Sequence, residues 1–320
     1  MRRGLFENII PDCFNKKSRN WNITLLRSFD VWCELSFSED VLKYYRSMIR
    51  EQINNVTFPK DDFERFPIYY ISKRKKVRIC KHIKYMSNNN IYLLICEGVR
   101  LKIIKIEISE LAKVLQLDNS MGIVINVQYK YISCMDKNRK EMRMYVYDLL
   151  YHFGYKFKSE NEILYVGYTQ NPEDRPFKGT HEGLTQILYN YYDKRKEDIF
   201  ISYQQFHVNS LVTNGLITIQ SSNTMTNEID IVTESKIIES SLIKYYLEGK
   251  RYNYIREENY LLNRLKDDLF DRKITSLIFL LDYKKSNSMF YYKDGRTRSK
   301  IVNFEIKQSN DKILLTTTST

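Results

Sequence analysis

Apolar and polar residues follow two periods along this chain, one typical of strands and one typical of helices. Strand-like runs occur at 91–99, 101–108 and 122–134, and again at 275–283, 289–293, 301–306 and 312–317. Helical spacing occurs at 38–54, 183–194, 233–249 and 259–270. The two patterns alternate without long linkers, so the sequence predicts a folded protein that mixes both kinds of element.

The middle of the chain predicts a small domain of its own. Its pattern favours strands at 144–150, 163–169 and 198–206, and helices at 183–194 and 233–249. We therefore expect an α+β fold, with a small antiparallel sheet flanked by helices over 141–258. An N-terminal α/β or α+β module would cover 1–140, and a C-terminal helix with a β-rich extension would cover 259–320. Asp294 and Gly295 predict a hairpin turn in that extension.

Composition supports a real core and gives few boundary signals. Apolar residues make up 43% of 320 positions, which is enough to bury a core. Only 10 glycines and 5 prolines occur, so domain limits must come from changes of pattern. The five cysteines are scattered, which predicts reduced thiols and a cytoplasmic location. No apolar run is long enough to span a membrane, so no membrane partner is expected.

The charge balance points to an anionic partner. A formal net charge of +12 favours a polyanion such as nucleic acid, because each neutralised phosphate releases counterions. The same Lys-rich, Asn-rich, Ile-rich and Tyr-rich usage would also follow from an AT-rich genome. Charge alone therefore suggests a class of partner and leaves the reaction open.

Three sequence pieces suggest a reaction. They are "YVY" at 145–147, "LYVGYTQNPEDR" at 164–175 and "ESSLIKYYLEGKRYN" at 239–253. Together they resemble the GIY-YIG nuclease family, in which two tyrosine-bearing strands pair as a hairpin and a later helix carries a metal-binding glutamate. The resemblance covers about 142–256 and implies a metal-dependent enzyme that cuts DNA.

The resemblance also implies roles for particular residues. Glu239 would hold Mg²⁺ or Mn²⁺, and Arg175 would bind the phosphate charge that develops during hydrolysis. Tyr147 would deprotonate or orient the water, which requires nearby positive charge because an ordinary tyrosine pKa is near 10. The remaining implied site residues are Tyr165, His181 and Asn253, with Gly167 allowing close backbone approach.

Two departures from the family pattern concern the first motif. Tyr145 stands where the first signature has a glycine, and seventeen residues separate Tyr147 from Tyr165, more than this hairpin usually has. A longer hairpin loop could absorb the difference, because loop closure depends weakly on length. The departures leave Glu239 in place and put the identity of the general base in doubt.

Two basic stretches are candidate nucleic-acid contacts. The run at 73–84 holds seven Lys or Arg in twelve residues and includes Lys73, Arg74, Lys75, Lys76 and Arg78. In a strand it would serve phosphate contacts, or it would be a solvated edge that resists pairing. The second stretch, at 290–300, combines aromatic residues with Lys293, Arg296 and Arg298, and an ordinary soluble hairpin explains it equally well.

Three functions are consistent with these patterns. The first is a Mg²⁺-dependent DNA endonuclease, in restriction, defence, mobile-element transfer or repair, whose flanking segments choose the substrate. The second is a member that binds nucleic acid without cutting it, which the altered first motif favours. The third is an interaction module whose tyrosine-rich surface binds a protein partner or a second copy in a homodimer.

Overall fold

The structure of the chain is a computed structural model. It describes residue 4 and residues 17–33, 43–44, 46–47, 49–50, 68–87, 89–118, 122–172, 186–190, 196–214, 216–247, 255–284, 291–294, 297–309 and 312–317.

The chain divides into two compact units. Unit 1 comprises residues 1–73, 161–195 and 199–320, and unit 2 comprises 74–160 with 196–198. The expected boundaries near 140 and 258 do not coincide with this division. Unit 2 is instead inserted between two strands of unit 1, because the chain leaves unit 1 after Lys73 and returns to it at Asn161.

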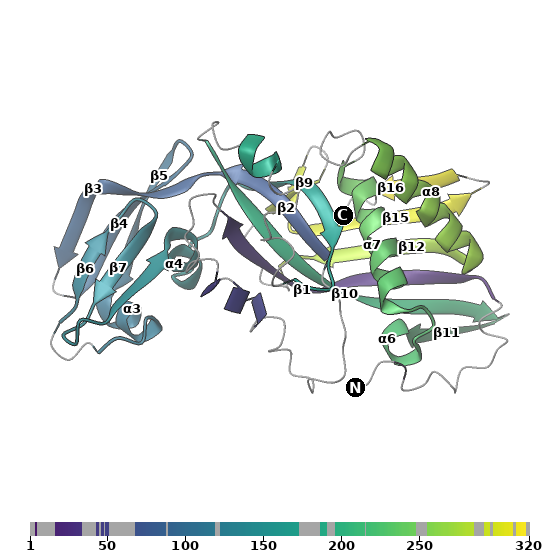
Figure 1. Cartoon of the computed structure of the whole chain (residues 1–320), viewed down its shortest axis with the longest axis horizontal. Helices are drawn as coiled ribbons and strands as arrows, with labels where there is room; N and C mark the ends of the chain where they lie inside the picture. Colours follow the sequence, from purple (N-terminus) through teal and green to yellow (C-terminus); the bar gives the residue numbers. More distant parts are fainter. Residues whose placement is uncertain are drawn as a thin grey trace. The chain divides into compact units, whose positions relative to one another are not determined.

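A large mixed sheet forms the frame of unit 1 (Figure 1). Its strand order is β14-β13-β9-β2-β10-β1-β12-β15-β16, and β11 pairs with β10. β1 and β12 are parallel, whereas β1 and β10 are antiparallel. The strands are β1 (Arg19–Cys33), β2 (Ile68–Lys75), β9 (Glu160–Tyr168), β10 (Glu197–Asn214), β11 (Ile217–Ser222), β12 (Ile274–Asp282), β13 (Tyr291–Asp294), β14 (Thr297–Ser299), β15 (Ile301–Ser309) and β16 (Lys312–Thr317).

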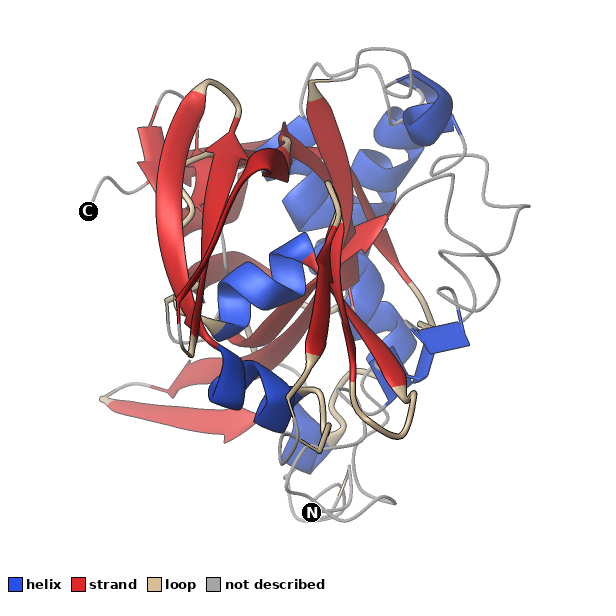
Figure 2. Ribbon diagram, turned by 90° about the vertical axis from the view of Figure 1, so that its left-hand side faces the viewer, coloured by secondary structure: helices blue, strands red, loops and turns tan. Residues whose placement is uncertain are grey.

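The expected fold class is wrong. The sequence predicted a small antiparallel sheet flanked by helices, but the described chain is strand-rich and its main sheet has ten strands (Figure 2). Strands from before and after 141–258 join β9 and β10 in this one sheet. Periodicity within a segment does not specify such distant partners, because pairing is decided by packing across the whole fold.

Helices cover one face of the large sheet. α7 (Ile231–Leu247) and α8 (Ile255–Asp271) lie over it, and the short α6 (Asn223–Thr226) precedes them (Figure 1). Their apolar residues share one buried cluster with strand residues such as Trp21, Tyr70 and Phe279. A second buried cluster, which includes Tyr69, Ile201 and Tyr203, lies on the opposite face, because neighbouring side chains along a strand point to opposite sides.

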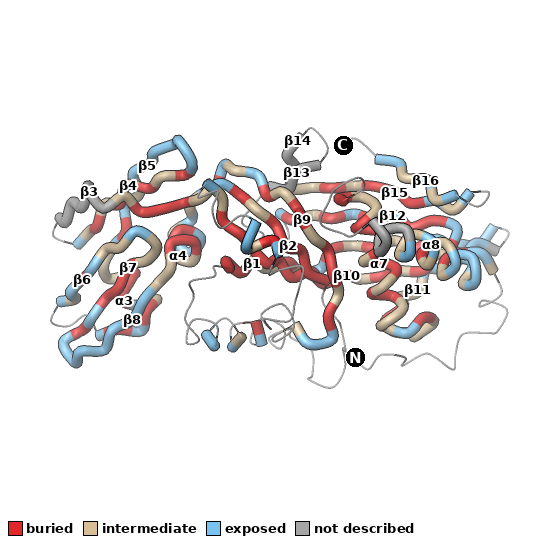
Figure 3. Tube along the Cα trace, turned by 45° about the horizontal axis from the view of Figure 1, so that its top comes forward, coloured by how far each residue is buried: buried red, intermediate tan, exposed pale blue. Residues whose placement is uncertain are grey.

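Unit 2 contains two three-stranded antiparallel sheets, with strand orders β3-β4-β5 and β6-β7-β8. Figure 3 shows its buried and exposed segments. The elements are β3 (Val77–Ser87), β4 (Asn90–Glu97), β5 (Arg100–Glu107), α3 (Ile108–Val114), β6 (Val124–Val127), β7 (Tyr131–Met135), β8 (Glu141–Tyr145) and α4 (Val146–His152).

Local predictions succeeded where the period was unambiguous. The strand predicted at 163–169 is β9, the helix predicted at 233–249 is α7, and the hairpin β13–β14 forms on either side of the predicted turn. The strand predicted at 144–150 is wrong, since β8 ends at Tyr145 and α4 begins at Val146. Val146, Leu149 and Leu150 are buried at the i, i+3, i+4 spacing of a helix face.

Among the residues described, no helix has the length and apolar character needed to cross a membrane.

Candidate functional site

The tyrosine-bearing strand that pairs with β9 is β2. The two strands are antiparallel, with Tyr69 opposite Gly167 and Ile71 opposite Tyr165. The expected hairpin between 145–147 and 164–167 is therefore wrong. The strand that pairs with β9 instead contains "IYY" at 68–70, and the connection between the two strands contains most of unit 2.

Gly167 is covered by two tyrosine rings. A Cβ placed on it would lie 2.7 Å from Oη of Tyr69 and 2.7 Å from Cε1 of Tyr165. The two rings are 5.9 Å apart between centroids and tilted by 33°. A side chain at 167 would push one of them away, so the glycine is required for the rings to lie against β9.

A third tyrosine binds the segment that follows β9. The hydroxyl of Tyr203 on β10 donates a hydrogen bond to the carbonyl of Pro172 at 2.9 Å. Its ring lies 6.5 Å from that of Tyr69 between centroids. Burial raises the pKa of Tyr203 well above its ordinary value, and the nearby Cys33 and Tyr69 raise it further. The Tyr203 hydroxyl therefore remains a neutral donor. The turn at 171–172 is thus fixed against β10.

Glu239 reaches the same end of β9 from the helix side. α7 begins after Asp230, whose Oδ1 accepts hydrogen bonds from the amides of Val232 and Thr233 at 3.1 and 3.0 Å, as an N-cap does. Two turns further on, Oε1 of Glu239 accepts a hydrogen bond from the backbone N–H of Tyr168 at 3.0 Å. The carboxylate is half-buried and lies beside the residue that follows Gly167.

A cation lies over the Tyr168 ring, on the same helix as Glu239. Nζ of Lys236 is 5.9 Å from the centroid of the Tyr168 ring. Lys236 precedes Glu239 by three positions on α7, so both side chains lie on neighbouring parts of one helix face. At the end of β9, Tyr165, Gly167 and Tyr69 therefore lie on the sheet face opposite α7, whereas Glu239 and Lys236 lie on the helix side. Sequence reasoning missed Tyr69 and Lys236.

Three further predicted site residues cannot be placed. Arg175, His181 and Asn253 lie outside the described residues. They stay predictions from the family resemblance.

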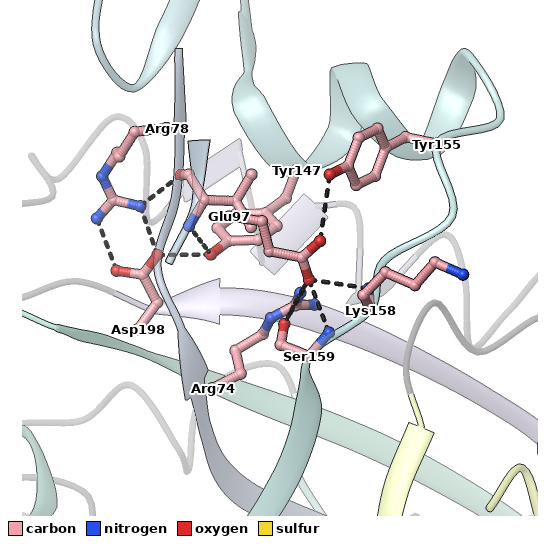
Figure 4. Close-up of polar contacts among 9 residues, drawn as sticks. Arg74, Arg78, Glu97, Tyr147, Tyr155, Lys158, Ser159 and Asp198 are labelled. Carbon is pink, nitrogen blue, oxygen red and sulfur yellow. Dashed lines mark hydrogen bonds and ion pairs between the residues drawn. The ribbon is translucent and has the colours of Figure 1, made fainter. Parts of the chain in front are cut away.

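Tyr147 belongs to unit 2, whereas Tyr165 and Glu239 belong to unit 1. It lies on α4, and its hydroxyl donates to Oδ2 of Asp198 at 2.6 Å and accepts from the amide of Val77 at 3.1 Å (Figure 4). Arg78 binds both oxygens of Asp198, at 2.5 and 2.7 Å. Burial and the charge of Asp198 raise the pKa of Tyr147 well above its ordinary value. A general base would need the opposite shift, so the role expected for Tyr147 is not compatible with this geometry.

A second buried carboxylate lies in the same unit. Oε1 of Glu97 accepts hydrogen bonds from the amides of Lys158 and Ser159 at 2.9 and 2.7 Å, and it lies 3.4 Å from Nη2 of Arg74 (Figure 4). Oε2 accepts from the hydroxyl of Tyr155 at 3.1 Å. Burial would raise the pKa of Glu97, but the hydrogen bonds from Ser159 and Lys158 and the charge of Arg74 outweigh it and leave that pKa lowered.

These ion pairs change the interpretation of the basic run. Arg74 and Arg78 are 2% exposed and bind carboxylates inside unit 2, so they are not the phosphate contacts that the sequence suggested. Lys73 lies 3.5 Å from Glu162 within unit 1, whereas Lys75 is exposed and Lys76 is half-buried.

In the second basic stretch, at 290–300, the backbone of Lys293 pairs with that of Arg298 across β13 and β14. Arg296 lies outside the described residues.

Within the described ranges, no three His, Cys, Asp or Glu side chains gather as a metal-binding group. Cys33, Cys80, Cys96 and Cys134 are free thiols, and Cys13 lies outside the described residues.

In comparisons with known proteins, no family model, curated protein or solved structure matches the chain.

Proposed function

We propose that the chain is a metal-dependent nuclease whose reaction centre lies where β9 ends beside α7. The observation that carries the proposal is the hydrogen bond from the amide of Tyr168 to Glu239, directly after the Tyr165–Gly167 motif. It supports the ordered resemblance to the GIY-YIG family because it unites two motif pieces that are 71 residues apart in the sequence.

The pairing of β2 with β9 adds support. The family resemblance implies two paired tyrosine-bearing strands, and β2 supplies the partner that 145–147 does not. Tyr69 is fully buried, whereas Tyr165 is half-buried. We therefore assign the substrate-facing hydroxyl to Tyr165 and a positioning role to Tyr69, whose ring lies against that of Tyr165.

The donor set fits a hydrated divalent cation. A single carboxylate suits Mg²⁺, which keeps most of its waters and takes one or two protein carboxylates. The amide of Tyr168 fixes Oε1 of Glu239, so the carboxylate is held in one orientation. The bound ion would supply Lewis-acid stabilisation of a phosphate oxygen. Mn²⁺ takes the same oxygen ligands.

The chain's own residues have distinct tasks in this proposal. Hydrolysis adds water across a P–O bond and develops negative charge on the phosphate oxygens. Lys236 places positive charge over the Tyr168 ring, on the same helix as Glu239, and Arg175 is the further cation that the resemblance implies. By the resemblance, Tyr165 would orient the phosphate or the water through its hydroxyl at the end of β9, from the sheet face opposite Glu239. DNA is the expected substrate.

Cleavage of supercoiled plasmid and of single-stranded DNA, with Mg²⁺ or Mn²⁺, tests the proposal. We expect Glu239→Gln to reduce the cleavage rate by roughly 100-fold or more, and Tyr165→Phe to reduce it by a smaller factor. Tyr70→Phe is the matched control for Tyr165→Phe, because Tyr70 is a fully buried tyrosine of β2 whose ring packs 5.7 Å from that of Tyr246. It should keep wild-type activity.

Two outcomes would contradict the nuclease proposal. If the folded wild type binds DNA with steep salt dependence but never nicks it, the chain is a nucleic-acid-binding protein that does not cut. If Glu239→Gln cleaves as fast as the wild type, the reaction centre lies elsewhere.

A further inference from the structure

β5 is an exposed edge strand in unit 2. In the described chain, it ends the sheet β3-β4-β5 and has one hydrogen-bonded neighbour, β4. The strand is exposed over its first half, shown in pale blue in Figure 3, where Leu101 is 63% and Ile103 is 55% exposed. A long exposed edge presents unpaired backbone groups and acts as a template for another strand.

The exposed residues continue an apolar surface onto β4. Leu101 lies opposite Cys96 and Ile103 lies opposite Leu94, so these four side chains share one face of the sheet. Both β4 residues are half-buried. The other face contains Ile106, which is fully buried opposite the equally buried Ile91. The apolar residues of the outer face are therefore not explained by the core of unit 2.

The edge is also positively charged. Arg100, Lys102 and Lys105 are exposed along β5. The one acidic residue of the strand, Glu107, accepts hydrogen bonds from Ser109 and Asn89 at the far end. An occupant of this edge must therefore be complementary to three cations and to two exposed apolar side chains.

We propose that the edge of β5 binds an extended acidic segment of a protein partner, which adds a fourth strand to the sheet. Strand addition uses main-chain hydrogen bonds for affinity and alternate side chains for specificity. Acidic side chains would face Arg100 and Lys102 on one face of the strand, and apolar ones would cover Leu101 and Ile103 on the other, which also carries Lys105. A nucleic acid would leave those apolar residues uncovered, and a second copy would bring like charges together. The proposal does not depend on nuclease activity.

A synthetic peptide tests the proposal on the full-length chain. The probe alternates glutamate with valine over eight positions and is followed by fluorescence anisotropy. We expect saturable binding, and at least a tenfold loss of affinity for the Arg100→Glu/Lys102→Glu variant, which reverses the two cations that face the glutamates. Lys312→Glu is the matched control, because Lys312 is an exposed lysine on another edge strand, β16. It should bind the probe as the wild type does.

A second peptide separates strand addition from simple charge attraction. It has the same side chains but is N-methylated at alternate residues, in both registers, which removes backbone donors. We expect both methylated registers to bind less tightly, with one losing nearly all affinity. Equal binding of the methylated and unmethylated peptides would overturn the proposal. So would the absence of binding up to about 1 mM, or an Arg100→Glu/Lys102→Glu variant that loses affinity only for a DNA oligonucleotide.

Discussion

Removal of the Tyr147 hydroxyl distinguishes its structural role from the catalytic role that the sequence suggested. In the Tyr147→Phe variant, Asp198 loses a donor at 2.6 Å and the amide of Val77 loses its acceptor at 3.1 Å. A hydrogen bond to a charged group contributes about 1.5–3 kcal/mol, and an unsatisfied buried amide costs about 1–3 kcal/mol. Arg78 still binds both oxygens of Asp198, which limits the loss. We expect the free energy of unfolding to fall by roughly 3 kcal/mol.

The assay can assign this loss to one unit. Trp21 and Trp32, the two tryptophans of the chain, both lie in unit 1. Urea unfolding followed by tryptophan fluorescence therefore reports on unit 1, and circular dichroism at a backbone wavelength reports on both units. If the units unfold separately, the variant should shift the dichroism transition and leave the fluorescence midpoint unchanged; if they unfold together, both probes should shift by the same free energy. A variant with unchanged stability and abolished DNA cleavage would refute the structural assignment and return Tyr147 to the reaction.

Two other predictions concern packing and charge. Gly167→Ala should destabilise unit 1 by about 1–3 kcal/mol, because the new methyl group overlaps the Tyr69 and Tyr165 rings. Combining it with Tyr69→Phe, which removes the overlapping Oη, should recover part of that loss in a double-mutant cycle. Glu97→Gln should destabilise unit 2 near neutral pH. Since the folded pKa of Glu97 is lowered from 4.5, the stability advantage of the wild type should be full above that value and should shrink as pH falls through the folded pKa. A pH-independent difference in the unfolding free energy would contradict the assigned ionisation.

The elements of the candidate site could be predicted from the sequence, but their partners could not. The strand at 163–169 and the helix at 233–249 have clear local periods, and both form. The first tyrosine strand was sought close to the second, whereas the structure pairs Tyr69 with Gly167 after an insertion. Pro67 followed by "IYYIS" is a strand signal that local inspection could have weighed. Only the pairing of β2 with β9 shows that this strand belongs to the candidate site.

The basic run was misjudged for a related reason. Seven cations without an acid in twelve residues look like a solvated surface. The acids that neutralise Arg74 and Arg78 lie 23 and 120 residues away, on β4 and β10. Buried charges are tolerated when they are paired, and distant sequence partners are sufficient for that. Part of the positive charge of the run is therefore neutralised inside unit 2.

The position of the insertion allows the two proposed roles of the chain to be tested separately. Lys73 and Glu162 form the last pair of β2 and β9 within unit 1, and Arg74 begins unit 2 in the next position. The ion pairs of Arg74 and Arg78 and the hydroxyl of Tyr147 all join segments of unit 2 to one another. The hydrogen bond from Tyr168 to Glu239 lies wholly in unit 1. If Glu239→Gln loses cleavage and unit 2 keeps its stability, the chemistry lies at β9 and α7. If the charge-reversal variant of β5 loses peptide binding and still cleaves DNA, partner recognition lies at β5.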